Sequence, residues 1–130
     1  MYEIKPSVHE IDNSCFNMNT ETIAEVLDLY VERVKTRLQE KLSAIYLFGS
    51  VARGDYTADS DIDVMLVLNM DEEEIREIRS SLTRLSSDLN LDYNVQFNKF
   101  TVSRNDFEAR RILFNNVRNE GVLLYNETQR

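Results

Sequence analysis

Cysteine, histidine and proline are almost missing from this sequence of 130 residues, since each occurs once, as Cys15, His9 and Pro6. A single cysteine excludes an intramolecular disulfide, and a single histidine has no second histidine with which to hold a metal ion. The longest uninterrupted apolar runs are about five residues, whereas a helix that crosses a membrane needs about 20. No basic start is followed by an apolar segment, so we expect no signal peptide. These absences predict a cytoplasmic protein without a membrane-spanning segment.

Basic residues are also in deficit, because 15 Lys and Arg stand against 23 Asp and Glu, which gives a formal net charge of −8. Such a surface repels a phosphate backbone, and this disfavours nucleic acid as a direct substrate. A small anionic ligand remains compatible with the charge, since a bound divalent cation reverses the local sign.

The length fits one domain, and the hydrophobic pattern divides it into helices and strands. We expect an N-terminal arm over residues 1–19 and a single domain over 20–130. Within the domain the pattern predicts helices over 20–42, 71–89 and 103–119, a short helix or turn over 50–53, and strands over 44–48, 61–68, 93–100 and 122–125. The fold class is therefore α/β (α+β), a small mixed β-sheet with helices packed mainly on one face and the other face open at the strand ends.

Two of the three glycines flank one short segment in "GSVARGDYTADSDIDVMLVL", residues 49–68. Near its end, Asp61 and Asp63 are two apart on a predicted strand, so their side chains project from the same face. Two neighbouring carboxylates repel each other, and a divalent cation between them removes this electrostatic repulsion. Mg²⁺ takes oxygen ligands of this kind together with substrate phosphates. The pair therefore predicts a metal site.

The start of the same segment has the features of a phosphate site. Gly49 and Ser50 follow an apolar strand and precede a possible helix, where free amides bind anions and a glycine lets the backbone approach closely. Arg53 supplies a positive charge, and Ser60 can bond backbone groups just before the aspartates. Each part alone has an ordinary explanation, a turn for Gly-Ser and a solvated strand start for Asp-x-Asp. Their coincidence around two predicted strands is far more specific.

This combination resembles the signature of the nucleotidyltransferase superfamily related to DNA polymerase β, in its minimal form. The family pattern is Gly-Ser, about ten residues, and then Asp-x-Asp, and the matching positions here are Gly49, Ser50, Ala52, Arg53, Gly54, Ser60, Asp61 and Asp63. The tail over 114–125 is also similar to the ending of small prokaryotic members. The resemblance covers about residues 20–126 and implies the nucleotidyltransferase fold.

The resemblance implies transfer of a nucleoside monophosphate, expected to be AMP from ATP, to a hydroxyl group. By it, Asp61 and Asp63 would ligate two Mg²⁺ ions, and Gly49 and Ser50 would hold the β- and γ-phosphates, with Arg53 assisting. Family members carry a third carboxylate on the next strand, and the position aligned with it here is Asn94, an amide. Asp92, two residues earlier, is the candidate substitute.

Small stand-alone members of the family are commonly paired with a helical HEPN-class protein, as antitoxin to a ribonuclease toxin. By that resemblance this chain would be an antitoxin-like enzyme that modifies a partner protein. Two alternatives stay open: a catalytically degenerate module that binds nucleotide or partner, which Asn94 favours, and transfer to a small-molecule hydroxyl. Whether Asp63→Asn abolishes function in the presence of the partner discriminates between the antitoxin-like enzyme and the degenerate module.

Other residues allow two interpretations. The last predicted helix carries a cluster of arginines, which is either a solvated face or a patch that faces a partner or a phosphate: Arg104, Arg110, Arg111 and Arg118. Tyr46, Tyr93 and Phe97 are expected in the core, and Tyr56 is the candidate for stacking on a base.

Overall fold

The computed structural model describes residues 4–5 and 20–129. Its elements, in chain order, are α1 (Thr20–Leu38), the 3₁₀ turn η2 (Gln39–Lys41), β1 (Leu42–Phe48), α2 (Gly49–Arg53), β2 (Ile62–Leu68), α3 (Glu72–Tyr93), β3 (Phe97–Ser103), α4 (Arg104–Ala109), α5 (Asn115–Glu120), β4 (Val122–Asn126) and η3 (Glu127–Gln129). Of the expected N-terminal arm, only Ile4 and Lys5 belong to the described residues, and Ile4 is buried in the core. His9 and Cys15 lie outside them.

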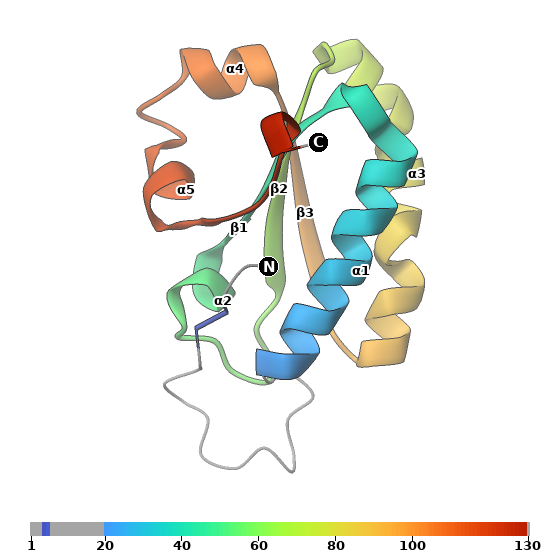
Figure 1. The fold of residues 1–130 in the computed structure, drawn as a ribbon, viewed down its shortest axis with the longest axis vertical. Coiled ribbons are helices and arrows are strands. Elements are labelled where there is room, and N and C mark those ends of the chain that lie inside the picture. Colours follow the sequence, from blue (N-terminus) through green and yellow to red (C-terminus); the bar gives the residue numbers. More distant parts are fainter. Residues whose placement is uncertain (1–3, 6–19, 130) are drawn as a thin grey trace.

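The four strands form one mixed sheet in the order β3-β2-β1-β4 (Figure 1). β1 pairs antiparallel with both β2 and β4, whereas β2 and β3 run parallel. A parallel neighbour needs a long crossover connection, and α3 supplies it. The expected α/β class with a small mixed sheet is confirmed.

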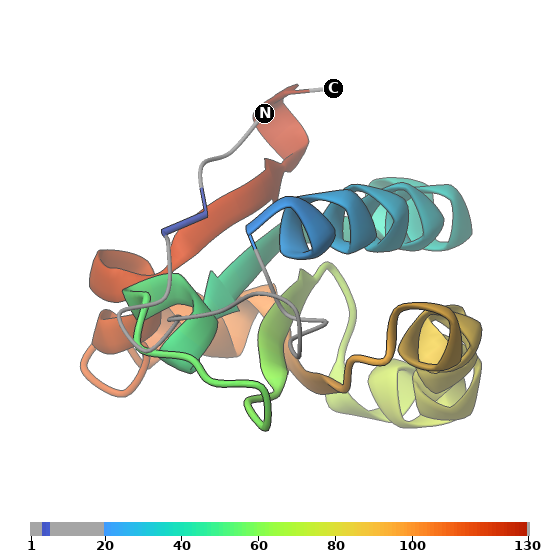
Figure 2. The same ribbon diagram turned by 90° about the horizontal axis from the view of Figure 1, so that it is seen from below.

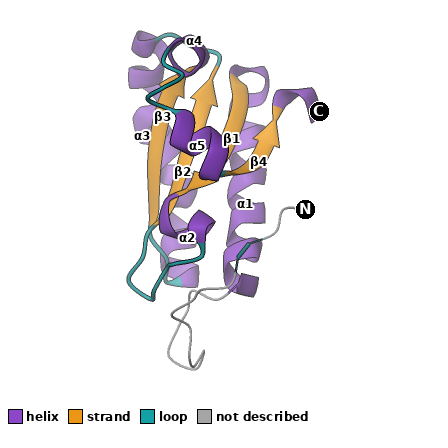
Figure 3. Ribbon diagram, turned by 90° about the vertical axis from the view of Figure 1, so that its left-hand side faces the viewer, coloured by secondary structure: helices purple, strands orange, loops and turns teal. Residues whose placement is uncertain are grey.

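The two faces of the sheet bury different sets of residues, as the alternation of β2 shows. Ile62, Val64 and Leu66 belong to the main core beneath α1 and α3, while Met65 and Val67 belong to a second cluster beneath α4 and α5. Figures 1 and 2 show the two long helices together on one face, and Figure 3 looks onto the other face, where α4 and α5 lie. The helices are therefore packed mainly on one face, but the other face is partly covered rather than open.

The main core is closed by contacts between the long helices and the sheet. One stripe of α1 is fully buried, and Tyr30 from this stripe stacks on Phe97 of β3 with ring centroids 4.5 Å apart. At the surface, Arg33 of α1 forms an ion pair of 2.5 Å with Asp88 of α3 and also donates to the Leu85 carbonyl. These contacts fix α1 and α3 side by side.

Side chains cap the starts of α3 and α4. Asp71 and Glu74 form a reciprocal capping box at the start of α3, and the Ser103 side chain accepts from the Asp106 amide at the start of α4. The single helix expected over 103–119 is wrong, because α4 ends at Ala109 and α5 begins only at Asn115. The break lets the second half fold back over the sheet, so that the rings of Phe107 and Phe114 meet at 5.2 Å.

The buried apolar residues of α1 and α3 lie along one side of each helix. No helix in the described part of the chain is both long and apolar enough to cross a membrane.

Candidate active site

The Gly-Ser and Asp-x-Asp segments meet where β1 ends and β2 begins. Phe48, the last residue of β1, pairs with Asp63 of β2 in the antiparallel ladder. Gly49 follows Phe48 directly and opens α2, and Asp61 directly precedes β2. The fold therefore brings together the two halves of the motif, which are separated by a loop in the sequence.

The backbone of Gly49 lies close to the Asp63 carboxylate. Its φ of +74° lies in the left-handed region that favours glycine. A Cβ atom at this position would lie 3.1 Å from Cγ of Asp63 and closer still to its Oδ2 atom. Position 49 therefore requires glycine both for backbone conformation and for the space that the Asp63 carboxylate occupies.

The short helix α2 is anchored from inside and closed by a second glycine. Val51 and Ala52 are buried, and Gly54, with φ +85°, ends the helix and donates to the Ser50 carbonyl at 2.9 Å. Arg53 is exposed and forms an ion pair with Asp55 at 3.3 Å. Its charge also acts on Asp63, so that Arg53 stands within electrostatic reach of that carboxylate.

The loop between α2 and β2 is held by one buried ring and one tight turn. Tyr56 is 1% exposed, so it is a core residue, and the expectation that it stacks on a base is wrong. A free base cannot reach a side chain that the core encloses. Ser60 accepts a hydrogen bond of 2.8 Å from the Thr57 amide and so shapes the turn before Asp61, as expected of a serine that bonds backbone groups.

Asp63 is half-buried, whereas Asp61 is exposed. Burial raises the pKa of the Asp63 carboxyl above its ordinary value, and the negative charge of Asp61 adds to this. A hydrogen bond from the Asn98 side chain and the charge of Arg53 oppose the increase without cancelling it. Ionised Asp63 is therefore short of positive charge in the protein alone.

Asn98 occupies the position next to Asp63 on the third strand of the site. The parallel ladder pairs Asp63 with Asn98, the second residue of β3. The strand expected over 93–100 begins at Phe97 instead, because α3 continues to Tyr93. The assignment of the third-carboxylate position to Asn94 is therefore wrong. Asp92, in the last turn of α3, is not beside Asp63 in the ladder either.

The error has a recognisable source in the sequence. Asn94 adopts the left-handed conformation, φ +51°, as the residue that ends α3, a role that asparagine accepts more readily than most residues. The alternation of polar and apolar residues over 93–98 is typical of a strand and led to the early start. An asparagine that ends a helix at position 94 is the signal that the strand starts later. Asn94 is still near the site, because it lines a cavity of about 210 Å³ together with Ser60 and Asp61.

The donor set at this end of the sheet suits a magnesium ion that is shared with a substrate. No group of three or more His, Cys, Asp or Glu side chains able to hold a metal ion occurs within residues 4–5 and 20–129. Asp61 and Asp63 offer two carboxylates beside an amide, and Mg²⁺ is usually held by one or two carboxylates plus phosphate oxygens and water. The residues present therefore fit Mg²⁺ bound with a phosphate ligand.

The sequence of this region matches a known family. The description of that family is polymerase beta, nucleotidyltransferase, and the match covers residues 32–130, which include α2, all four strands and every site residue described above. The chain belongs to this nucleotidyltransferase family.

Two relatives and two solved structures agree with this assignment. Both relatives are putative protein adenylyltransferases of Methanocaldococcus jannaschii. One is 34% identical over 98 residues, which are 74% of this chain and 91% of that protein. The other is 32% identical over 73 residues, which are 56% of this chain and 72% of that protein.

The solved structures are more distant in sequence and show the fold. A putative nucleotidyltransferase from Sulfolobus solfataricus has a TM-score of 0.53 and 23% identity, covering 84% of this chain and 87% of that one. A structure described as a toxin–antitoxin with AMP-PNP has a TM-score of 0.50 and 22% identity, covering 77% and 73%. The nucleotidyltransferase fold expected from the sequence is confirmed.

Proposed function

We propose that this protein is a Mg²⁺-dependent nucleotidyltransferase that transfers AMP from ATP to a hydroxyl group of a partner protein. The observation that carries the proposal is the contact between Gly49 and Asp63. It places the start of α2, a segment suited to phosphates, directly against a half-buried carboxylate with a raised pKa. A surface turn has no need for this contact.

Each site residue has a part in the proposed reaction. Asp61 and Asp63 hold two Mg²⁺ ions, while Gly49 and Ser50 bind the β- and γ-phosphates and Arg53 assists. Ser60 fixes the turn that delivers Asp61 to the site. When bound, the Mg²⁺ ions neutralise triphosphate charge and position the phosphates for in-line displacement. The acceptor oxygen then bonds to the α-phosphorus, the bond from that phosphorus to the oxygen bridging to the β-phosphate breaks, and pyrophosphate leaves with the electron pair.

Asn98 shapes the proton chemistry of this reaction. Hydrogen bonding from its side chain opposes the rise in the pKa of Asp63, but a neutral amide cannot take a proton from the attacking hydroxyl. The proton must leave to water or to a base on the acceptor itself. The protein's contribution to rate is then positioning and charge stabilisation.

A protein acceptor is supported by the relatives and by one feature of the surface. The two relatives carry the description protein adenylyltransferase, and one similar fold comes from a toxin–antitoxin with AMP-PNP. In the turn between α4 and α5, Ile112 and Leu113 are 95% and 65% exposed and follow the exposed Arg110. We assign this turn to contact with an acidic surface of a HEPN-class partner, to which Arg110 is complementary in charge.

Transfer of a radioactive label tests the proposal. The chain is incubated with ATP labelled at the α-phosphate, Mg²⁺ and a purified HEPN-class protein of the same organism. Label is expected on the partner protein, and it should disappear with EDTA or with Asp63→Asn. Label on a small hydroxyl compound with this chain alone would instead indicate a small-molecule acceptor.

The second candidate is a degenerate module that binds nucleotide or the partner without turnover. Asn98 favours it, because an amide beside Asp63 leaves the site with one carboxylate fewer than the family pattern has. Calorimetric titration with a non-hydrolysable ATP analogue separates the two functions. Mg²⁺-dependent binding that is lost in Asp63→Asn, but with no label on any acceptor, identifies the binding module.

A further inference from the structure

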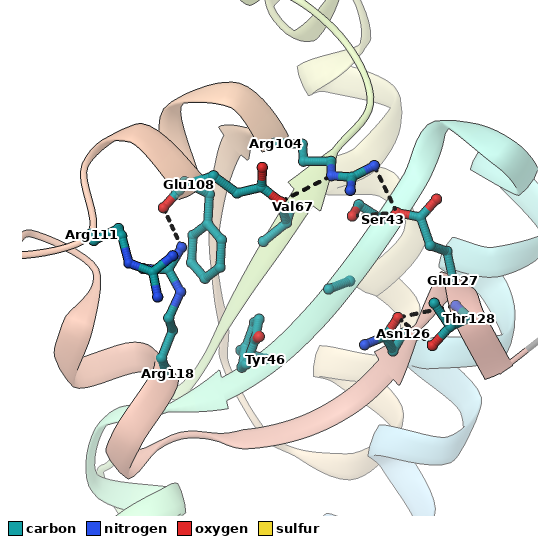
Figure 4. A pocket seen from close by; sticks show the side chains of 12 residues that line it. Ser43, Tyr46, Val67, Arg104, Glu108, Arg111, Arg118, Asn126, Glu127 and Thr128 are labelled. Atoms are coloured by element: carbon teal, nitrogen blue, oxygen red, sulfur yellow. Dashed lines mark hydrogen bonds and ion pairs between the residues drawn. The ribbon is translucent and has the colours of Figure 1, made fainter.

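A second cavity lies at the other end of the sheet from the carboxylates. It has a volume of about 550 Å³ and is bordered by α4, α5, the far ends of β1 and β2, and the C-terminal segment (Figure 4). Val67 in its wall is four residues beyond Asp63 on β2, which corresponds to about 13 Å along the strand at about 3.3 Å per residue. The cavity is therefore separate from the site described above.

The cavity contains an arginine pair whose charge is not balanced. Arg104 is paired on two sides, with Glu108 at 3.2 Å and Glu127 at 3.7 Å. Arg111 and Arg118 also line the cavity, and neither forms an ion pair with a carboxylate of the described residues. Two unbalanced guanidinium groups in one cavity are notable in a chain of net charge −8.

Arg118 is held in a fixed orientation. Its Nη2 atom donates to the Phe107 carbonyl, and its guanidinium lies 3.9 Å above the centre of the Phe107 ring. Its Nη1 atom is buried and finds no hydrogen-bond acceptor in the part of the chain that the structure describes. A buried charged donor without an acceptor is costly, and an oxyanion in the cavity beside Arg111 and Arg118 would balance the guanidinium charge.

The remaining walls suggest what accompanies the anion. Tyr46 is half-buried, borders the cavity and lies 5.5 Å from the Phe107 ring, so an apolar surface adjoins the arginine pair. Guanidinium groups bind phosphate oxygens in pairs with matched geometry, and a volume of this size is in the range of small-molecule sites. We propose that this cavity binds a small organic phosphate, with the phosphate at Arg111 and Arg118 and the carbon portion against Tyr46.

Polymeric anions fit these observations less well. A nucleic-acid backbone would meet the net charge of −8 over the rest of the chain. An acidic peptide could place a carboxylate at Arg111, but the arginines lie in a cavity with an aromatic wall rather than on a continuous basic surface. A compact ligand that carries both an anionic and an apolar part matches both features.

The test is an NMR titration of the ¹⁵N-labelled full chain with AMP, inorganic phosphate and a hexaglutamate peptide, in EDTA. Because the buffer contains no divalent cation and no ATP, the result does not depend on transfer activity. Saturable shifts with AMP are expected at residues 46, 107, 111 and 118. Inorganic phosphate should shift 111 and 118 with weaker affinity, because it lacks the carbon portion.

Variants make the assignment specific. Arg111→Gln, at an exposed position, should weaken AMP binding at least tenfold, and Arg118→Gln should do the same if it remains folded. Arg110→Gln is the matched control, since Arg110 is exposed and lies outside the cavity wall. Equal weakening by Arg110→Gln, equal affinity for inorganic phosphate and AMP, tighter binding of hexaglutamate, or shifts confined to residues 49–63 would each overturn the proposal.

Discussion

The Asp63 carboxylate fills the space that a side chain on residue 49 would need, so that Gly49 and Asp63 form one unit although a loop separates them in the sequence. The conformation of Gly49, at φ +74°, adds a second reason for glycine at this position. The first reason concerns the carboxylate rather than the stability of α2. Gly49 is therefore part of the geometry of the candidate site.

Gly49→Ala should abolish Mg²⁺-dependent binding of an ATP analogue, because the new methyl group displaces the Asp63 carboxylate. Gly54→Ala is the control, since Gly54 also has a positive φ but ends α2 away from the strand ladder. Both variants should lose about 1–2 kcal/mol of stability for a left-handed alanine. Calorimetric titration and thermal melts measure the two effects. Equal binding by the two variants would contradict the role assigned to Gly49.

Asn98→Asp should restore a third carboxylate beside Asp63. Without metal, repulsion between the carboxylates should lower the melting temperature, and Mg²⁺ with an ATP analogue should raise it by more than in the wild type. The Mg²⁺ concentration that gives half-maximal activity in the transfer assay should fall. Asn94→Asp is the matched control, because Asn94 ends α3 instead of pairing with Asp63. A larger metal response in Asn94→Asp would return the third position to that residue.

Tyr30→Phe should change how stability depends on alkaline pH. The Tyr30 ring is buried, its hydroxyl has no hydrogen-bond partner within the described residues, and burial raises its pKa. The unfolded chain therefore loses this proton first, near pH 10, and the folded protein loses stability as pH rises further. In the wild type this loss amounts to at most about 1.4 kcal/mol of unfolding free energy per pH unit. Phenylalanine has no hydroxyl to ionise and so removes the loss, and it is neutral or slightly stabilising at pH 7.

Urea unfolding of both proteins from pH 7 to pH 11 measures this difference. The advantage of Tyr30→Phe should widen above pH 10. A constant difference over the whole range would mean that the Tyr30 hydroxyl ionises equally in both states.

Ile112→Glu should weaken binding of the HEPN-class partner tenfold or more, about 1.4 kcal/mol, a loss typical of a central interface residue. Its effect on stability should stay within about 0.5 kcal/mol, because the side chain is 95% exposed. Leu91→Glu is the control, since Leu91 is 83% exposed on α3, on the other face of the sheet. Calorimetry with the purified partner gives both affinities. Equal weakening by Leu91→Glu would place the interface elsewhere.

Much of the fold could be predicted from local signals. The hydrophobic pattern is a short-range signal, and it predicted the helices over 20–42 and 71–89 that the structure contains as α1 and α3. The break between α4 and α5 was missed. Its cause is not local, because the break brings Phe114 onto the Phe107 ring and Arg118 onto the Phe107 carbonyl over the sheet.

The site divides in the same way. Asp61, Asp63, Gly49 and Ser50 could be selected from one continuous segment, since the motif and its spacing are in the sequence itself. Asn98 could not, because its place opposite Asp63 depends on the register of two parallel strands joined by α3. An error of four residues in the start of β3 was enough to assign its position to Asn94.

The alternation along β2 has a consequence for how this family can diversify. Every second side chain of β2 is fixed in the main core, and the strand lies between β1 and β3. The residues between them, Asp63 among them, therefore inherit the rigidity of the whole sheet. The turn around Ile112 lies between α4 and α5, and its exposed side chains can accept substitution without moving the carboxylate. Under the proposed function, donor chemistry and partner choice are thus carried by separate parts of one small domain.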